Sequence, residues 1–307
     1  MNATYTFGTL TLLAACSACG EFDPGSLLTH TRVLGARVEV AAAPELASPR
    51  PTQRARVSWI TLAPRDEPAL RSAFVACLVR PDEQTPCSQG PLAELSLEGS
   101  EFDLDVPAES ALAGARQIAV RGVICDRGEP GKGPDGQPAC VGPGAHGTGV
   151  TLTIPVTAPG AAQNRNPSFV GSSISLGGQP LGEETGDELP DDCAGSALPQ
   201  LKADGKKYAL ELRLGPGQRD LYLDSGGRGE LREELQVSHF TSAGELERQH
   251  AFVEADDDSE QPLLAQRWTA PEGDEVPPGG RLVRFAFALR DPRGGFAFVR
   301  RAACALP

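Results

Sequence analysis

The sequence contains no apolar run near the roughly 20 residues that a membrane-spanning helix needs. Aromatic residues make up only 5% of the chain, and four of its 28 basic residues are lysines. The net charge is −13, so acidic residues outnumber basic ones. We therefore expect no spanning helix and no nucleic-acid partner, because nucleic-acid binding requires clustered Lys and Arg. The acidity also disfavours direct adsorption to anionic membrane surfaces.

Helical periodicity is scarce as well, with one helical turn near residues 109–115 as the exception. Apolar residues instead alternate with period two in short runs separated by Gly, Pro and Asp, which is typical of β-strands. A first series of predicted strands covers residues 33–40, 54–62, 73–79, 92–97, 102–106, 117–125 and 150–156. A second series covers residues 169–176, 208–214, 221–223, 235–240, 247–252, 264–269, 282–289 and 296–301. This succession of short strands predicts an all-β chain. Its 40% of hydrophobic residues is enough to bury a core.

Residues 7–15 form a short apolar run that ends in Leu13-Ala14-Ala15 and is followed by Cys16. This order resembles the lipobox of bacterial lipoproteins, in which a leader is cleaved and the new N-terminal cysteine receives lipid. The resemblance implies a signal peptide at residues 1–15, lipidation of Cys16 and export. Residues 1–7 contain no Lys or Arg, which departs from the basic start of most leaders. Ser17 stands where Asp would mark inner-membrane retention in some sorting systems, so we expect anchoring at the outer membrane, on its periplasmic face or at the cell surface.

The two series of strands predict two domains in tandem. We place a flexible tether at residues 16–30, one β-sandwich at 31–158, a linker at 159–167 and a second β-sandwich at 168–307. The linker lies where Pro, Gly and Asn interrupt both periodicities. Sequence identity between the halves is not evident, so we expect the two domains to share a strand arrangement without a sequence repeat.

Residues 279–295 run from an alternating strand into Asp291-Pro292-Arg293-Gly294-Gly295. This stretch resembles the final hairpin of bacterial immunoglobulin-like (Ig-like) and PKD-like domains, in which glycines supply the positive φ of a tight turn. The resemblance implies two Ig-like β-sandwich domains and transfers no functional residue. As a whole the chain resembles two-domain bacterial surface lipoproteins with Ig-like modules.

Six of the eight cysteines lie in the predicted folded part, since Cys16 is assigned to lipid and Cys19 to the tether. Proximity favours three disulfides, although six cysteines allow 15 connectivities. The favoured pairs are Cys77–Cys87, Cys125–Cys140 and Cys193–Cys304. Disulfides belong to oxidising compartments such as the periplasm or cell surface. Zinc is disfavoured, because the sole Cys-x2-Cys pair is Cys16 with Cys19.

Asp224-Ser225-Gly226-Gly227 resembles the nucleophile turn of chymotrypsin-like proteases. Those enzymes place the histidine earlier in the chain, but here the upstream His30 lies in the tether and His146 in a Gly-rich loop. A Ser-Gly-Gly loop between strands is the simpler interpretation. No catalytic residue is predicted, and a hydrolase in the second domain is the last alternative.

Two acidic runs are candidate calcium loops, because Ca²⁺ takes six to eight oxygen ligands. They comprise Glu183, Glu184, Asp187, Glu188, Asp191 and Asp192, and Glu254, Asp256, Asp257, Asp258 and Glu260. Neither has the order of an EF-hand loop, and solvated acidic loops are the simpler interpretation. We expect no cofactor, with calcium as the alternative.

His239 and His250 flank a predicted hairpin, and together with Glu234 or Glu247 they are a candidate metal site. Such a site requires all of these side chains on one face of the sheet, and strand register cannot be read from the sequence. We therefore predict no metal.

The sequence thus predicts a lipid-anchored, exported, non-enzymatic surface or periplasmic protein that acts as a structural, adhesion or assembly module. Its expected partners are the membrane, through the lipid, and an undefined protein or glycan. The alternative is a carbohydrate- or peptide-binding module. Trp59 and Trp268 are the candidate stacking aromatics for that alternative, although core anchors are the better interpretation.

Overall fold

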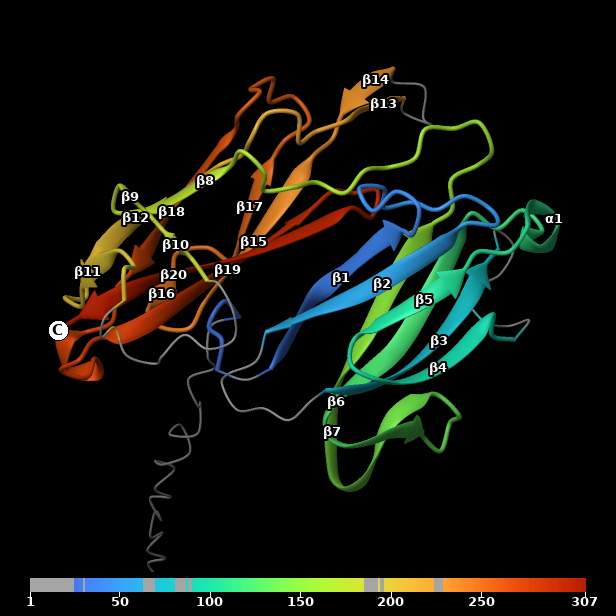
Figure 1. The fold of residues 1–307 in the computed structure, drawn as a ribbon, viewed down its shortest axis with the longest axis horizontal. Coiled ribbons are helices and arrows are strands. Elements are labelled where there is room, and N and C mark those ends of the chain that lie inside the picture. Colours follow the sequence, from blue (N-terminus) through green and yellow to red (C-terminus); the bar gives the residue numbers. More distant parts are fainter. Residues whose placement is uncertain are drawn as a thin grey trace, which may run out of the picture.

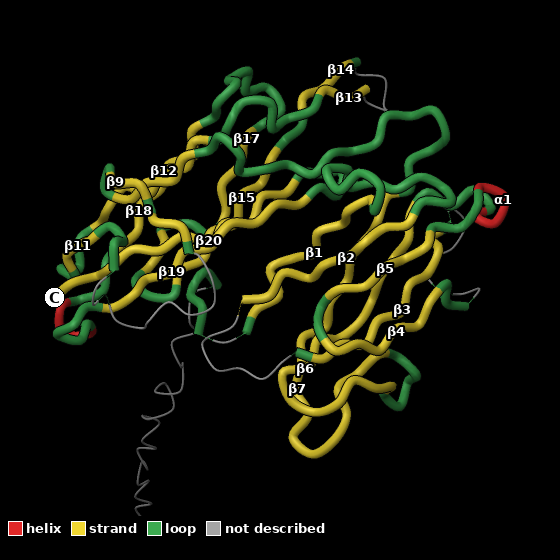
Figure 2. The backbone as a smooth tube through the Cα atoms, viewed as in Figure 1, coloured by secondary structure: helices red, strands yellow, loops and turns green. Residues whose placement is uncertain are grey.

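The computed structural model describes residues 25–29, 31–62, 70–80, 87, 90–184, 193, 196–223 and 229–307. Strands dominate this part of the chain (Figure 2). Its helical elements are two single turns, α1 (Glu109–Leu112) and the 3₁₀ turn η1 (Gly273–Glu275). The all-β prediction is confirmed, and α1 lies in the segment where a helical turn is expected. None of the helices in the described ranges is long and apolar enough to cross a membrane.

The first sandwich has a sheet of three strands and a sheet of four (Figure 1). The three-stranded sheet has the order β1-β2-β5 and consists of β1 (Arg32–Val40), β2 (Arg54–Leu62) and β5 (Glu101–Asp105). The four-stranded sheet has the order β4-β3-β6-β7 and consists of β3 (Arg71–Val79), β4 (Ala93–Glu98), β6 (Gln117–Lys132) and β7 (Pro138–Pro155). Alternate residues of both sheets face one another and form a single apolar core, as period two requires.

The second sandwich adds short strands at the edges of two larger sheets. One sheet has the order β16-β18-β12-β8-β9 and consists of β8 (Ser173–Leu176), β9 (Gln179–Pro180), β12 (Lys207–Arg213), β16 (Glu245–Leu246) and β18 (Leu263–Thr269). The other has the order β10-β20-β19-β15-β17, with β11 also paired to β20. It consists of β10 (Gly182–Glu183), β11 (Gln200–Lys202), β15 (Leu235–Thr241), β17 (His250–Val253), β19 (Arg281–Arg290) and β20 (Phe296–Leu306). A separate hairpin joins β13 (Leu221–Leu223) to β14 (Glu230–Arg232).

The two sandwiches share one topology once the short edge strands are set aside. In each, the first, second and fifth long strands form one sheet, and the fourth, third, sixth and seventh form the other. In the constant-type Ig arrangement the fourth strand lies with the first, second and fifth. Here β4 pairs with β3, and β17 pairs with β15, so the fourth strand has changed sheets in both halves. The expected repetition of architecture is therefore present, and the predicted boundaries at residues 158 and 168 fall between the two sets of strands.

Three disulfides join the pairs that proximity favours, with Cα–Cα distances of 5.0 Å for Cys77–Cys87, 5.7 Å for Cys125–Cys140 and 5.6 Å for Cys193–Cys304. The second of these lies at the base of a hairpin arm, in which β6 and β7 pair beyond the sheet as far as Lys132 and Pro138. Lys132 on the arm forms an ion pair with Glu94 on β4 at 2.8 Å, which ties the arm to the sheet. The sequence predicts shorter strands here, because Gly and Pro interrupt the alternation within the arm.

The predicted flexible tether is partly wrong. Residues 1–24 and 30 lie outside the described residues, but residues 25–29 lie against the second sandwich. Leu27 pairs with Thr241 at the end of β15, and Ser26 is buried. Gln249 Nε2 donates to the Gly25 carbonyl at 3.2 Å. The chain is therefore fixed to the second sandwich before it enters β1 of the first.

Candidate functional site

Several residues singled out from the sequence lie outside the described part of the chain. They are Cys16, Cys19, His30, Asp187, Glu188, Asp191, Asp192, Asp224 and Ser225. Lipidation of Cys16 therefore stays a prediction, and so does the interpretation of Asp224-Ser225-Gly226-Gly227 as a loop between strands.

The two histidines of the candidate metal site lie on opposite faces of their sheet. His239 on β15 pairs with Phe287 and meets its ring edge-on at 5.6 Å inside the second sandwich. His250 on β17 pairs with Ser238, the residue next to His239, and therefore points to the other face. The pair cannot ligate one ion. Burial lowers the pKa of His239 to about 4, so its imidazole is neutral at pH 7.

Both tryptophans are core residues, as the sequence analysis favours. Trp59 is stacked on Phe74 with ring centroids 5.7 Å apart in the first core. Trp268 is fully buried in the second core, where its indole N–H donates to the Ala243 carbonyl at 3.0 Å. Neither ring is available as a platform for a sugar.

The guanidinium of Arg219 binds the backbone of the acidic run at residues 254–260. Arg219 donates from Nη2 to the Glu254 carbonyl at 2.6 Å and from Nη1 to the Asp257 carbonyl. In the other run, Glu184 accepts from Arg284 at 3.1 Å. Within the described ranges no three Asp, Glu, His or Cys side chains gather closely enough to hold a metal ion. A guanidinium bound to the carbonyls of the second run competes with calcium there.

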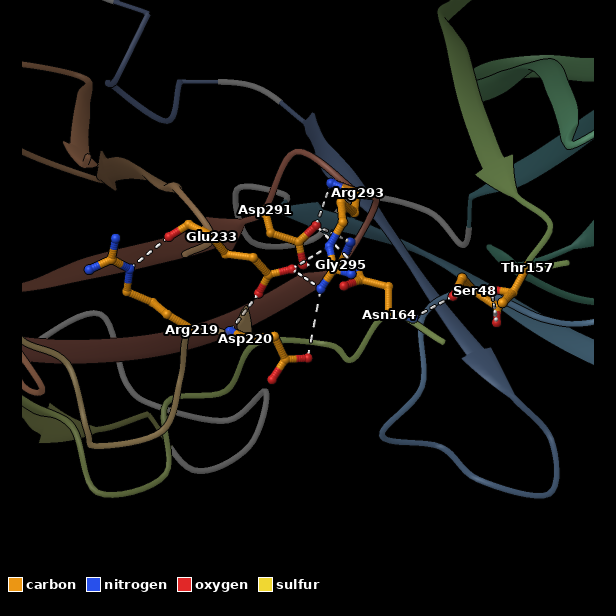
Figure 3. Close-up of polar contacts among 9 residues, drawn as sticks. All are labelled: Ser48, Thr157, Asn164, Arg219, Asp220, Glu233, Asp291, Arg293 and Gly295. Atoms are coloured by element: carbon orange, nitrogen blue, oxygen red, sulfur yellow. Dashed lines mark hydrogen bonds and ion pairs between the residues drawn. The ribbon is translucent and has the colours of Figure 1, made fainter. Parts of the chain in front are cut away.

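The polar site that the structure does assemble starts at the turn between β19 and β20 (Figure 3). Asp291 Oδ1 accepts from the backbone N–H groups of Arg293 at 2.7 Å and Gly295 at 2.9 Å, as Asp often does in turns. Gly294 has φ +97°, a conformation that favours glycine. Gly295 is needed for a different reason, because a Cβ there would overlap Asp291 Oδ2. The turn motif recognised in the sequence is therefore built around a buried carboxylate.

Asn164 connects this turn to the first sandwich. It is only 4% exposed, and its Nδ2 donates to both Asp291 carboxylate oxygens at 3.2 and 3.1 Å. Its backbone N–H donates to Ser48 Oγ at 2.6 Å, and its carbonyl accepts from the Ala47 N–H at 2.8 Å. Thr157 Oγ1 donates to the same Ser48 Oγ at 2.8 Å. The predicted linker at 159–167 is thus a strap bonded to both sandwiches.

Glu233 extends the cluster towards the β13–β14 hairpin. It is 3% exposed, and its Oε1 accepts from Arg293 Nε at 2.7 Å. Its Oε2 accepts from the Asp220 backbone N–H at 3.0 Å. The guanidinium carbon of Arg293 lies over the Tyr222 ring, 4.7 Å from the ring centroid. Burial and the neighbouring Asp291 carboxylate raise the pKa of Glu233. A buried ion pair with these extra hydrogen bonds fixes the turn, the hairpin and the start of β15 together.

Asn166 and an apolar cluster complete the junction between the sandwiches. The Asn166 side chain donates to the Val38 carbonyl of β1 at 2.7 Å and accepts from the Phe296 N–H of β20 at 3.0 Å. It therefore bridges one strand of each sandwich. Beside it, apolar side chains from both halves form one buried cluster: Leu34, Leu62, Phe240 and Ala286, with Leu28, Ile60 and Phe298 packed against them.

The chemistry of this junction is that of a structural lock. Among the nine residues drawn in Figure 3, Asn164 Oδ1 is the one buried side-chain atom without a partner. The carboxylates of Asp291 and Glu233 are occupied by fixed donors, which leaves no free base aimed at a substrate. A shifted carboxyl pKa is here a consequence of burial in an ion-pair network rather than of catalysis.

Sequence reasoning missed Asn164, Asn166 and Glu233. One signal was present, since two of the three asparagines in the chain stand in the linker. A loose linker has no need of amide side chains, whereas a strap that bonds two surfaces uses both their donors and their acceptors. Glu233 gave no comparable signal, because its partner Arg293 is 60 residues away in the sequence.

No protein-family model and no curated protein matches this sequence. Solved structures that match over most of the chain include fibronectin(III)-like modules of CbhA from Clostridium thermocellum, with 8% identity, 88% of this chain and 94% of that chain covered, and a TM-score of 0.22. The adhesin InvE of Yersinia pseudotuberculosis matches with 10% identity, 89% and 60% covered, and a TM-score of 0.20. Elastase-activated alpha-2-macroglobulin of Escherichia coli matches with 10% identity, 93% and 22% covered, and a TM-score of 0.23. TM-scores this low assign no function, and the Ig-like architecture rests on the strand order.

Proposed function

We propose that this protein is an exported, lipid-anchored, non-enzymatic module of the bacterial envelope that displays two β-sandwiches as one rigid body for a structural, adhesion or assembly role. The observation that carries the proposal is the locked junction, in which Asn164 and Asn166 bond both sandwiches. Flexible tandem domains are the default when interdomain contacts are few and polar. Here the strap and an apolar cluster join both sandwiches, and the Glu233–Arg293 ion pair fixes the turn that the strap binds. This arrangement suits a module that holds surfaces at a fixed separation.

The three disulfides support the exported part of the proposal, because they persist in oxidising compartments. The Leu13-Ala14-Ala15-Cys16 sequence supports the lipid anchor. Cys16 precedes Gly25 by nine residues, a span of at most about 30 Å for an extended chain. Because Gly25 is bonded to Gln249 and Arg32, the anchor would hold the junction itself near the bilayer.

The experiment is metabolic labelling with a palmitate analogue and membrane fractionation of the full chain and its Cys16→Ala variant in a bacterium that processes lipoproteins. We expect the label and the membrane association to be lost in Cys16→Ala. The matched control is Cys19→Ala, which should retain both. Labelling that survives Cys16→Ala, or equal loss in the two variants, would contradict the anchor.

A peptide-binding module is the second candidate, and one groove favours it. A cavity of about 550 Å³ lies between the hairpin arm and the outer face of β3 and β4, lined by residues that include Val75, Pro130 and Pro138. Its walls are mostly apolar, which suits an extended peptide better than a sugar. Saturable binding of a peptide that is lost in a Val75→Asp variant would favour this candidate over a purely structural role.

A further inference from the structure

A second cavity lies between the two sandwiches. Its volume is about 340 Å³. Thr31, Arg32 and Thr148 line it from the first sandwich, and Ser238, His250 and Arg290 line it from the second. No Asp or Glu is among the described residues of its lining. In a chain with a net charge of −13, this is a local concentration of positive charge.

Arg290 is a half-buried guanidinium without a carboxylate partner among the described residues. Its Nη1 donates to Ser238 Oγ at 3.0 Å, and its Nη2 donates to the Leu34 carbonyl. Its guanidinium carbon also lies 5.4 Å from the centroid of the Phe296 ring. Neutral acceptors do not cancel the charge, and an uncompensated charge withdrawn from water is costly. Burial accordingly lowers the pKa of Arg290.

On the side of the first sandwich, two buried donor atoms beside the cavity have no hydrogen-bond acceptor. Arg32 donates from Nη1 to the Gly25 carbonyl at 2.9 Å, but its Nε is buried with no acceptor. Thr31 Oγ1 is another buried atom without a hydrogen bond. Buried donors are nearly always satisfied, so these two atoms leave hydrogen-bonding capacity unused beside the cavity.

His250 adds a further donor. Ser238 Oγ accepts from Arg290 and lies 3.0 Å from His250 Nδ1, and Gln236 Nε2 lies 3.3 Å from the same nitrogen. Both neighbours can donate to Nδ1, which assigns the remaining proton of the neutral ring to Nε2.

We propose that this cavity binds a small oxyanion, a phosphate or carboxylate group, between the guanidinium groups of Arg32 and Arg290. The planar guanidinium matches such groups in geometry and forms charge-assisted hydrogen bonds to them. Because the two arginines come from different sandwiches, the anion also crosslinks the junction. The site is independent of the anchor and of the arm groove.

The test is calorimetric titration of the full chain with inorganic phosphate, with sodium acetate in a parallel titration. We expect saturable one-to-one binding and a phosphate-dependent rise in melting temperature. Arg32→Gln and Arg290→Gln should each weaken binding at least about tenfold, because each removes charge-assisted hydrogen bonds. The matched control is Arg213→Gln. Arg213 is exposed on β12, in the sheet of the second sandwich that does not contain Arg290, and this variant should bind phosphate as the wild type does.

Binding of phosphate alone would identify a phosphate group, and binding of acetate as well would identify a carboxylate group; either supports the site. Absence of saturable binding of both anions would overturn it. Equal affinity in the wild type and Arg32→Gln would also overturn it. Arg32 stands at the start of β1, so this variant remains informative if Arg290→Gln does not fold.

Discussion

Asn164 donates its side-chain amide to both carboxylate oxygens of Asp291, a residue 127 positions later in the sequence. This contact joins the strap between the sandwiches to the final hairpin of the second. We expect its consequence to be mechanical, because hydrogen bonds from the strap to both sandwiches oppose a hinge motion there. The proposed rigid module depends on it.

Removal of this contact should destabilise the protein and loosen the junction. We expect Asn164→Ala to lower the free energy of unfolding by about 2–3 kcal/mol, because it removes the side-chain amide that donates to both oxygens of a buried carboxylate. Urea unfolding measures this. Asp258→Ala, at an exposed acidic residue, serves as the control and should change stability by less than about 0.5 kcal/mol. A loss in Asn164→Ala no larger than that of the control would refute the strap.

The Asp291 turn predicts a contrast between two glycines. Gly295→Ala should cost about 1–3 kcal/mol, because the added Cβ overlaps Asp291 Oδ2 and forces the turn to shift. Gly149→Ala should be neutral or slightly stabilising, since Gly149 has open space around its Cβ position. Thermal unfolding of the two variants side by side tests this, and equal losses would show that the turn is not closely packed.

His239 predicts a pH dependence of stability. Its pKa falls from 6.5 to about 4 on folding, so between those values the unfolded chain binds a proton that the folded chain does not. Protons therefore favour unfolding, and stability should fall by up to about 3 kcal/mol as the pH drops from 6.5 to 4. Chemical unfolding at several pH values should show a shallower dependence in His239→Leu than in the wild type.

The control for that series is Phe252→Leu, at an exposed, non-titrating side chain of β17, which leaves His239 in place and should keep the wild-type slope. Glu233 acts in the opposite sense, because its raised pKa makes stability fall as the pH rises through that value. Comparison of variants with the wild type at each pH cancels this contribution. Identical slopes in His239→Leu and the wild type would contradict the burial of a neutral imidazole.

The disulfides should differ in their contribution to stability. Cys193–Cys304 closes a separation of 111 residues and Cys125–Cys140 one of 15. Loop-closure entropy predicts about 4.7 kcal/mol for a loop near 100 residues and about 3 kcal/mol for one near 15. We expect the Cys193→Ala/Cys304→Ala double variant to lose more stability than Cys125→Ala/Cys140→Ala. Denaturant titration decides the order, and the reverse order would show that native-state packing outweighs chain entropy.

The alternation of apolar and polar residues was enough to locate most strands, because it is visible within each short stretch of sequence. Residues 54–62 alternate clearly and form β2 with those bounds. The hairpin arm was missed because Gly and Pro within residues 126–149 interrupt the same signal, although backbone pairing continues through them. The sheet to which the fourth strand belongs was equally hidden, since pairing with β3 or β5 leaves its own alternation unchanged.

The junction could not be predicted for a different reason. Its members are set by contacts between residues far apart in the sequence, and each one taken singly is an ordinary polar residue. Asn164 was placed in a linker on its composition, and that composition is correct for a segment without strands. The relative position of the two histidines could not be predicted either, because a shift of one residue in strand register decides whether His239 and His250 share a face of the sheet.

The central claim is that the two sandwiches move as one body, and residual dipolar couplings of backbone amides test it most directly. The rigid junction predicts that residues 32–155 and 173–306 share a single alignment tensor in the wild type, and that Asn164→Ala separates the tensors. Two different tensors in the wild-type protein would contradict the claim.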